Sequence, residues 1–152
     1  MGTGWRIVPA DHAARAFDGE GARLYGGRWN SPGVPMVYSS QHLSLAALEL
    51  RVHIDKTRMR KLHKCFAFHF EDSLASVFEA RRLPPEWRQE PPPPSLQRLG
   101  DDWVKTWASV ILAVPSAVIP GELNYLINPR HPDFGRIKFE TPTDFAFDHR
   151  LF

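Results

Sequence analysis

Short apolar runs, broken by proline and glycine, dominate the hydrophobic pattern of this chain. Residues 64–70 (KCFAFHF) alternate three phenylalanines with Cys65, Ala67 and His69, and this period of two predicts a strand with one face rich in aromatic rings. Other short runs are typical of strands as well, the last two flanking a turn at Pro142. They cover residues 34–40, 109–114, 136–139 and 145–147.

One segment has the longer period of an amphipathic helix. Residues 42–53 (HLSLAALELRVH) predict a helix with Ser40 as its N-cap. At about 100° per residue, Glu49 falls at the edge of the apolar stripe and not opposite it. A carboxylate in that position must be paired or reached by solvent through a cleft, so Glu49 is either a catalytic acid or half of a structural pair with an arginine. The predicted stripe consists of Leu45, Leu48 and Val52.

The fourteen prolines and ten glycines disfavour a helical bundle. We therefore expect an α+β fold: a single compact domain over residues 1–152, with small mixed or antiparallel sheets and flanking helices. Residues 83–96 are too rich in proline for a regular helix or a central strand, and they predict an irregular surface excursion within that domain.

Composition narrows the class of protein. With 152 residues, of which 43% are hydrophobic, the chain is long enough to form a core without disulfides, and its one cysteine, Cys65, cannot form an internal one. No export signal or membrane span is apparent, so a cytoplasmic protein is expected. A net charge of +2 does not imply nucleic acid, and the basic run at residues 56–64 is typical of a solvated helix end.

The stretch LYGGRWN is the first candidate for chemistry. Its paired glycines permit unusual backbone conformations and place Arg28 beside Trp29 on a polar loop. Held there, the Arg28 guanidinium could grip a phosphate or a carboxylate through two parallel hydrogen bonds. The alternative is a structural turn in which Arg28 pairs with a nearby acid and Trp29 caps the core.

A second candidate region spans residues 114–134. Ser116 follows a proline at the end of a predicted strand, without the GxSxG elbow of a hydrolase nucleophile. His131 lies in a loop between prolines, where it either touches a ligand or stabilises the loop by a hydrogen bond. The seven histidines lack metal-site spacing, and glycine-rich phosphate loops are absent, so neither a metal nor a prosthetic group is expected.

Four of these pieces together resemble the RES domain family, which is named for an arginine, a glutamate and a serine. They occur in the family order and at family-like spacing, and they cover most of the chain. The pieces are GGRWNSPG with Arg28, VYSS with Tyr38, LAALELRVH with Glu49, and VPSAVIPGELNYLINPRHPDF with Ser116.

The resemblance implies a fold related to the ADP-ribosyltransferase toxins and a cleft that takes NAD⁺ as substrate. It implies that this protein is the toxin of a type II toxin–antitoxin pair and that it arrests growth by cleaving the nicotinamide–ribose bond. Its partner would be an Xre-type helix-turn-helix antitoxin. The toxin would contact DNA only through this antitoxin, and it could form a homodimer within the complex.

The resemblance also assigns roles to individual residues. Glu49 would stabilise the oxocarbenium-like transition state, Arg28 would hold the phosphates, and Tyr38 would stack on the nicotinamide or the ribose. Further contacts to the dinucleotide would come from Ser116, Asn128, Tyr25 and His131.

Two rival functions remain open from the sequence. The same cleft would serve an ADP-ribosyltransferase that modifies a protein target, because water, phosphate and protein acceptors all attack the same carbon. A module without enzymatic activity would instead bind nucleic acid or a partner through the GGRW loop and residues 56–64, and its binding would depend on salt.

Overall fold

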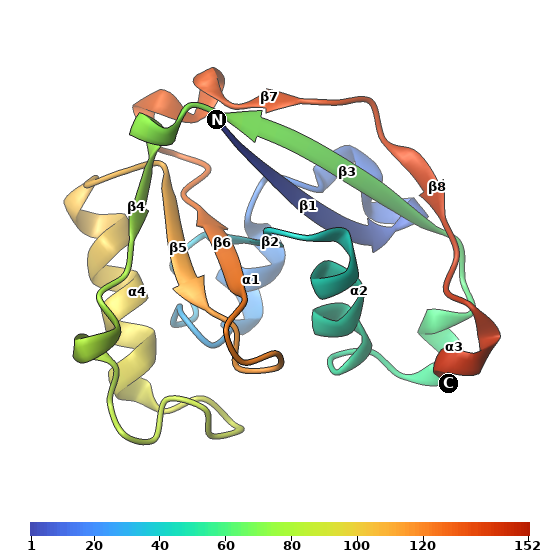
Figure 1. The fold of residues 1–152 in the computed structure, drawn as a ribbon, viewed down its shortest axis with the longest axis horizontal. Coiled ribbons are helices and arrows are strands. Elements are labelled where there is room, and N and C mark those ends of the chain that lie inside the picture. The colour runs from blue at the N-terminus through green and yellow to red at the C-terminus, as the bar shows by residue number, and fades with distance from the viewer.

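The fold is built on one strongly twisted sheet of eight strands (Figure 1). The computed structural model describes residues 1–152. In chain order the strands are β1 (Gly2–Pro9), β2 (Val37–Ser40), β3 (His63–Phe70), β4 (Ala75–Val77), β5 (Ile111–Pro115), β6 (Leu123–Ile127), β7 (Lys138–Phe139) and β8 (Thr143–Phe145).

The strands are ordered β4-β5-β6-β2-β1-β3-β7, and β8 also pairs with β3. Only β4 and β5 run parallel. The mixed sheet and the few helices confirm the α+β prediction.

The sheet has two parts, one with strands β4, β5, β6 and β2 and the other with β1, β3, β7 and β8, and few paired residues join them. β1 pairs with β3 along its whole length, whereas β1 and β2 share one registered pair, Trp5 with Ser40. Figure 1 shows β1 and β3 running diagonally across the molecule, away from the steeper β4, β5 and β6. The two parts therefore diverge on either side of the β1–β2 junction and leave room for a cleft beside it.

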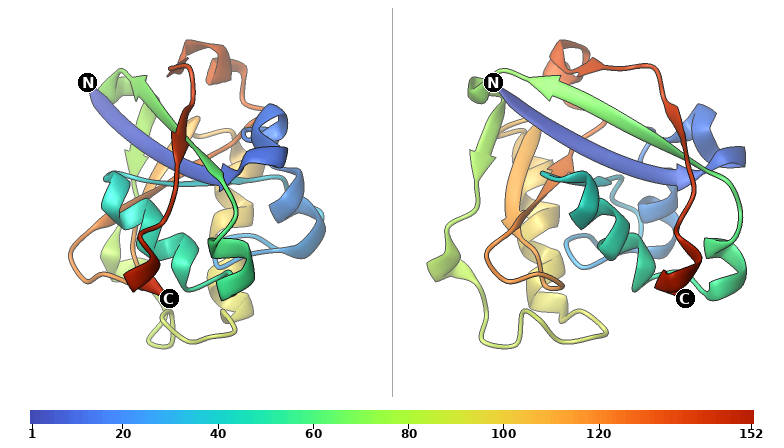
Figure 2. Two further views of the ribbon diagram at one scale, coloured as in Figure 1. Left: turned by 90° about the vertical axis from the view of Figure 1, so that its right-hand side faces the viewer. Right: turned by 45° about the vertical axis from the view of Figure 1, so that its right-hand side comes forward.

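Four α-helices pack around this sheet. They are α1 (Glu20–Tyr25), α2 (Leu43–Arg51), α3 (Lys56–Met59) and α4 (Pro94–Thr106). Short 3₁₀ turns cover residues 10–15, 72–74, 80–82, 132–136 and 149–151. The C-terminal segment returns along β3 and ends beside α3, where Arg60 lies over the ring of Phe152 (Figure 2). No helix is long and apolar enough to cross a membrane.

The core contains two main clusters of buried side chains, and the second of them joins the two parts of the sheet. One cluster joins α4 to the sheet through Leu96, Trp103 and Leu126, and it also buries Trp29 of the GGRW loop. A second cluster, around Phe68, lies between β3, β5 and β6. Both faces of β3 are covered, so Cys65 and Ala67 are buried as well as the phenylalanines opposite them.

The predicted helix exists, but its predicted apolar stripe is wrong. Helix α2 buries Leu45 and Ala46 and contacts β1 and β2, whereas Leu48 and Val52 are exposed. Because α2 is only nine residues long and packs near its start, the rest of the stripe extends past the sheet. Ser40 is not its N-cap either: the Ser40 hydroxyl donates to Asn124 Oδ1, and His42 occupies the cap without a side-chain bond.

One boundary, one strand pairing and two strands also differ from what the sequence pattern indicates. The proline-rich excursion ends earlier than residue 96, because proline fits the first turn of a helix and α4 begins at Pro94. The two final strands do not pair with each other; β7 and β8 each pair with β3. Strands β4 and β6 had no strong pattern of their own, and β6 is a central strand only because β2 and β5 flank it.

Helix α4 holds the GGRW loop against the sheet. Gln97 Nε2 donates to the Gly27 carbonyl at 2.9 Å, and Asp101 Oδ1 accepts from the Ser31 amide at 2.9 Å. Between them, Gly100 approaches the loop so closely that an added Cβ would lie 1.7 Å from the Trp29 carbonyl oxygen. Only glycine permits this approach, since both sides of the contact are backbone.

We therefore expect Gly100→Ala to destabilise the fold. Helix propensity alone would favour alanine by about 1 kcal/mol. Separating α4 from the loop should outweigh that gain and lower the free energy of unfolding by about 1 to 3 kcal/mol. Gly21→Ala in α1 is the matched control, because its Cβ would meet nothing within 4 Å. Urea denaturation measures both variants, and a Gly100→Ala protein as stable as Gly21→Ala would contradict the packing argument.

Candidate functional site

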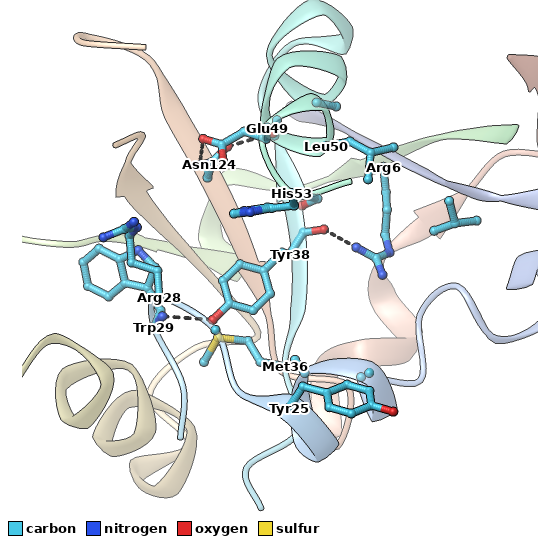
Figure 3. Close-up of a pocket in the computed structure, with 18 of the residues that line it drawn as sticks. Arg6, Tyr25, Arg28, Trp29, Met36, Tyr38, Glu49, Leu50, His53 and Asn124 are labelled. Carbon is cyan, nitrogen blue, oxygen red and sulfur yellow. Dashed lines mark hydrogen bonds between the residues drawn. The ribbon is translucent and has the colours of Figure 1, made fainter. Parts of the chain in front are cut away.

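A cleft of about 1300 Å³ lies beside the β1–β2 junction (Figure 3). Its walls come from β1, β2, α1, the end of α2 and the proline-rich segment that precedes α4. Arg28, Tyr38 and Glu49, from three separate parts of the sequence, all line it. The predicted catalytic residues are thus brought together in one cavity.

Glu49 is fixed by one of its two carboxylate oxygens. Ser116 Oγ and Asn124 Nδ2 both donate to Glu49 Oε1, each at 2.7 Å. No side chain or backbone group of the protein hydrogen-bonds to Oε2. The carboxylate is therefore held in a defined orientation while one oxygen is left for a ligand.

The register of the sheet explains why the two donors meet. Asn124 lies opposite Val114 on β5 and opposite Ser40 on β2, and Ser116 follows directly after β5. Ser40 Oγ donates to Asn124 Oδ1 at 2.7 Å, so the amide of Asn124 is oriented with its nitrogen toward Glu49. Three elements far apart in the chain thus position a single oxygen atom.

Ser116 lies behind Glu49 and not on the cleft surface. Its side chain is buried, and besides donating to Glu49 its hydroxyl accepts from the amides of Val118 and Ile119 at 3.1 and 3.0 Å. With these bonds made, the hydroxyl is fully occupied. The predicted hydrogen bond from Ser116 to a bound dinucleotide is therefore absent from this geometry, and the serine instead orients the glutamate.

Tyr38 forms part of the cleft wall with its ring, while its hydroxyl is used inside the protein. The hydroxyl donates to Asn30 Oδ1 at 2.6 Å and accepts from the Trp29 amide at 2.9 Å. Burial raises the pKa of Tyr38 far above its usual value, which keeps the phenol neutral. Tyr38 is thus no general base, and it ties the GGRW loop to β2.

Arg28 lies in the cleft but is engaged by the proline-rich segment. Its Nη1 donates to the carbonyls of Trp87 and Gln89 at 2.9 and 2.7 Å, and its Nη2 donates to Glu90 Oε2 at 2.6 Å. Trp29 is buried in the core. The contacts of the structural alternative are therefore present, with an acid that is 62 residues away in sequence.

Arg6 of β1 is a second guanidinium in the cleft, and sequence reasoning missed it. Its Nε donates to the Ala16 carbonyl at 2.7 Å and its Nη1 donates to the Tyr38 carbonyl at 2.6 Å, with no carboxylate within salt-bridge distance. Removal from water lowers the pKa of Arg6 to about 10, which leaves it charged at neutral pH. In Figure 3, Arg6 and Arg28 lie on opposite sides of Tyr38.

Besides Ser116, two more of the predicted site residues lie outside the cleft, Asn128 and His131. Asn128 follows the end of β6 and is four residues beyond Asn124, which corresponds to about 13 Å along an extended chain. Its side chain is buried, and its Oδ1 accepts from the Arg130 amide. His131 Nε2 donates to the Trp107 carbonyl, and its Nδ1 accepts from the Asp133 amide. Neither Asn128 nor His131 lines the cleft, and the hydrogen bonds of His131 are those of the alternative in which it stabilises its loop.

Further residues line the cleft, and all of them except Tyr25 could be found only from the structure. Tyr25 lines the rim of the cleft and is 84% exposed, and its ring is not directed toward Glu49 in Figure 3. His53 lies one helical turn beyond Glu49 and extends into the space between Glu49 and Tyr38 (Figure 3). Asn124 had no motif around it, and Arg6 sat in an ordinary strand sequence. No group of histidine, cysteine and acidic side chains is arranged to hold a metal ion.

Comparison with known proteins gives concordant matches. The family model described as the RES domain matches residues 3–148. A protein named Toxin Res from Yersinia enterocolitica is 37% identical over 148 residues, which are 97% of this chain and 97% of that protein. A Prs ADP-ribosylating toxin from a Sphingobium species is 34% identical over 152 residues, covering 97% of this chain and 94% of its own length.

A solved structure has the same fold. A chain of the M. tuberculosis MbcT–MbcA toxin–antitoxin complex superposes with a TM-score of 0.77 over 95% of this chain and 84% of that chain, at 19% sequence identity. At this identity the match shows a shared fold.

The serine behind Glu49 gives the site a direct test. Ser116→Ala removes the donor to Glu49 and leaves the amides of Val118 and Ile119 without their acceptor. We expect the free energy of unfolding to fall by about 1 to 3 kcal/mol. Ser95→Ala is the control, because Ser95 makes one 3.2 Å bond to Glu86 at the partly exposed start of α4. Equal stability of the two variants in thermal or urea unfolding would show that the Ser116 network is dispensable.

Proposed function

The chain belongs to the RES domain family, and we propose that it is the toxin of a toxin–antitoxin pair that breaks the nicotinamide–ribose bond of NAD⁺. Family membership rests on a match over nearly the whole chain and on toxins of similar length at 32–37% identity. The reaction is inferred from the cleft. Its substrate belongs to the cytoplasmic cofactor pool, where the toxin would act.

The observation that carries this proposal is the single fixed oxygen of Glu49. Loss of nicotinamide from NAD⁺ leaves positive charge on the ribose C1′ and its ring oxygen, as in glycoside hydrolysis. A carboxylate held in place before the reaction stabilises that charge without having to reorganise. Because Ser116 and Asn124 both bond to Oε1, Oε2 can face the ribose while the anion stays fixed.

The remaining cleft residues fit the rest of the dinucleotide. Arg6 and Arg28 supply two positive charges for the diphosphate, and the ring of Tyr38 between them offers a flat surface to the nicotinamide or the ribose. Asn128 and His131, which lie outside the cleft, have no part in this assignment. No metal or prosthetic group has a role in it either.

The bond changes are simple. The N1–C1′ bond breaks, its electron pair stays on nicotinamide, and an acceptor oxygen or other nucleophile bonds to C1′ as its proton leaves to solvent. Water as acceptor gives ADP-ribose, and phosphate gives its 1″-phosphorylated form. Glu49 acts on the charged ribose in both cases.

The second candidate function is transfer of ADP-ribose to a protein. The Sphingobium relative is named as an ADP-ribosylating toxin. The cleft here also exceeds the roughly 300 to 1,000 Å³ of common ligand pockets, which leaves room for an acceptor side chain. A purely binding module is less well supported, because residues 56–64 lie outside the cleft that holds Arg28.

The purified chain should therefore consume NAD⁺. Glu49→Gln should lower the rate of NAD⁺ consumption by about 100-fold or more, because the amide keeps the shape of the side chain but loses its charge. Release of nicotinamide measures the rate. NAD⁺ labelled in the adenylate half distinguishes the acceptors: label in a small product indicates water or phosphate, and label on a protein indicates transfer. Glu71→Gln, at an exposed residue outside the cleft, should keep full activity. Undiminished turnover in Glu49→Gln would remove the carboxylate from the mechanism.

We further propose that an Xre-type antitoxin silences the enzyme by covering the cleft. Exposed apolar side chains at the rim, Leu24, Tyr25 and Val52, offer a partner hydrophobic contact. Within the cleft, the two guanidiniums can donate hydrogen bonds to a carboxylate of the antitoxin, from a side chain or from its chain terminus.

The co-purified complex should be inactive, and Arg28→Ala should weaken it by about tenfold or more if a carboxylate occupies that site. Titration of NAD⁺ into the complex and measurement of antitoxin affinity by calorimetry test the two parts. Normal NAD⁺ binding to the complex would exclude occlusion. Unchanged affinity in Arg28→Ala would leave steric cover without anion mimicry.

A further inference from the structure

The proline-rich segment at residues 84–93, here called the strap, surrounds the Arg28 guanidinium. Three of its groups accept hydrogen bonds from Arg28: the carbonyls of Trp87 and Gln89, and the carboxylate of Glu90. The tip of the strap, including Glu90 and Pro91, lines the same cleft as Glu49. An acidic side chain of the protein thus lies at the anion site that the proposed substrate needs.

The bonds divide the guanidinium into two parts. Both protons of Nη1 are directed to backbone carbonyls, whereas Nη2 has one proton on Glu90 and Nε has no partner. Oxygens of a phosphate or carboxylate bind an arginine best through two parallel bonds, and here the Nε–Nη2 edge is the one without backbone acceptors. On that edge, Glu90 Oε2 accepts a hydrogen bond from Nη2.

The two kinds of contact also differ in how firmly they are held. Trp87 packs against the core cluster of α4, and Arg88 Nη2 donates to the Ala117 carbonyl at 2.9 Å, so the backbone of the strap is anchored on both sides of the cleft. The Glu90 side chain is 69% exposed. It can leave Arg28 without any change in the anchored backbone.

We propose that Glu90 is a built-in competitor that occupies the anion site of Arg28 and must be displaced when a diphosphate-bearing substrate binds. The identity of that substrate rests on the proposed function. The Trp87 and Gln89 carbonyls keep the guanidinium plane oriented, and the carboxylate reduces its affinity for phosphate. Glu90 thereby raises the substrate concentration at which the enzyme becomes half-saturated.

A purely structural ion pair accounts less well for these contacts. The backbone carbonyls already hold Arg28, and an ion pair with a largely exposed partner adds little stability. Stability therefore does not explain an acid at the position a ligand would take. Competition with the ligand explains the position of this acid, and it predicts that anions bind more tightly when the charge of Glu90 is removed.

The test uses Glu90→Gln, which keeps the size of the side chain and removes its charge. The matched control is Glu79→Gln, because Glu79 also forms an exposed 2.6 Å pair with an arginine, Arg81, but lies outside the cleft. Inorganic pyrophosphate is the probe, measured by calorimetry, and nicotinamide is the uncharged comparison. We expect pyrophosphate to bind about two- to fivefold more tightly to Glu90→Gln, the range that an exposed pair supports, with nicotinamide binding unchanged.

Two further measurements separate competition from a structural effect. In an Arg28→Ala background, Glu90→Gln should bring no gain, because the site for which Glu90 competes has been removed. With NAD⁺ as substrate, Glu90→Gln should lower KM by the same factor as the pyrophosphate Kd and leave kcat unchanged. Unchanged or weaker pyrophosphate binding in Glu90→Gln would overturn the proposal, as would an equal gain in Glu79→Gln.

The same experiments distinguish failure of this proposal from failure of the proposed function. Tighter pyrophosphate binding to Glu90→Gln in a protein that does not consume NAD⁺ would support the competitor and refute the reaction. NAD⁺ consumption with identical KM in wild type and Glu90→Gln would support the reaction and refute the competitor. Absence of pyrophosphate binding to both proteins would refute an anion site at Arg28.

Discussion

The architecture depends on satisfying one carboxylate in the wall of a cleft. Glu49 accepts from Ser116 and Asn124 at the same oxygen, and Asn124 is in turn oriented by Ser40. A charged group removed from water is costly unless it is hydrogen-bonded, so these bonds require α2, β2, β5 and β6 to meet in one register. A slip of one residue in β6 would turn Asn124 to the other face of the sheet and remove a donor from the glutamate.

The opposite wall of the cleft is positioned by contacts of another kind. The GGRW loop is held by backbone approach at Gly100, by the Asp101 carboxylate, and by the Tyr38 hydroxyl. Tyr38 therefore connects the two walls: its strand pairs with the strand of Asn124, and its hydroxyl binds the loop that carries Arg28. A change at this tyrosine would alter the separation of the Glu49 carboxylate from the loop that carries Arg28, as well as the cleft surface.

The cleft has positive charge on both sides of Tyr38 and a negative charge at Glu49. Arg6 has no carboxylate partner and Arg28 has one that is largely exposed, so positive charge is available on both sides of Tyr38. Glu49 provides the negative charge where nicotinamide would leave a positive one. This polarity fits NAD⁺, whose diphosphate is anionic and whose nicotinamide ring is cationic.

The sequence by itself determined the class of fold, the strands near residues 34–40, 64–70 and 109–114, and two residues of the cleft, Arg28 and Glu49. Local patterns are sufficient for this, because alternation, helical period and glycine pairs act over a few residues, whereas Tyr38 was indicated only by the family resemblance. Tertiary structure alone decided that Ser116 supports Glu49, that Asn128 and His131 lie elsewhere, and that Arg6, Asn124 and Glu90 belong to the site. Those assignments follow from strand register and from contacts between segments more than sixty residues apart, which no local pattern encodes.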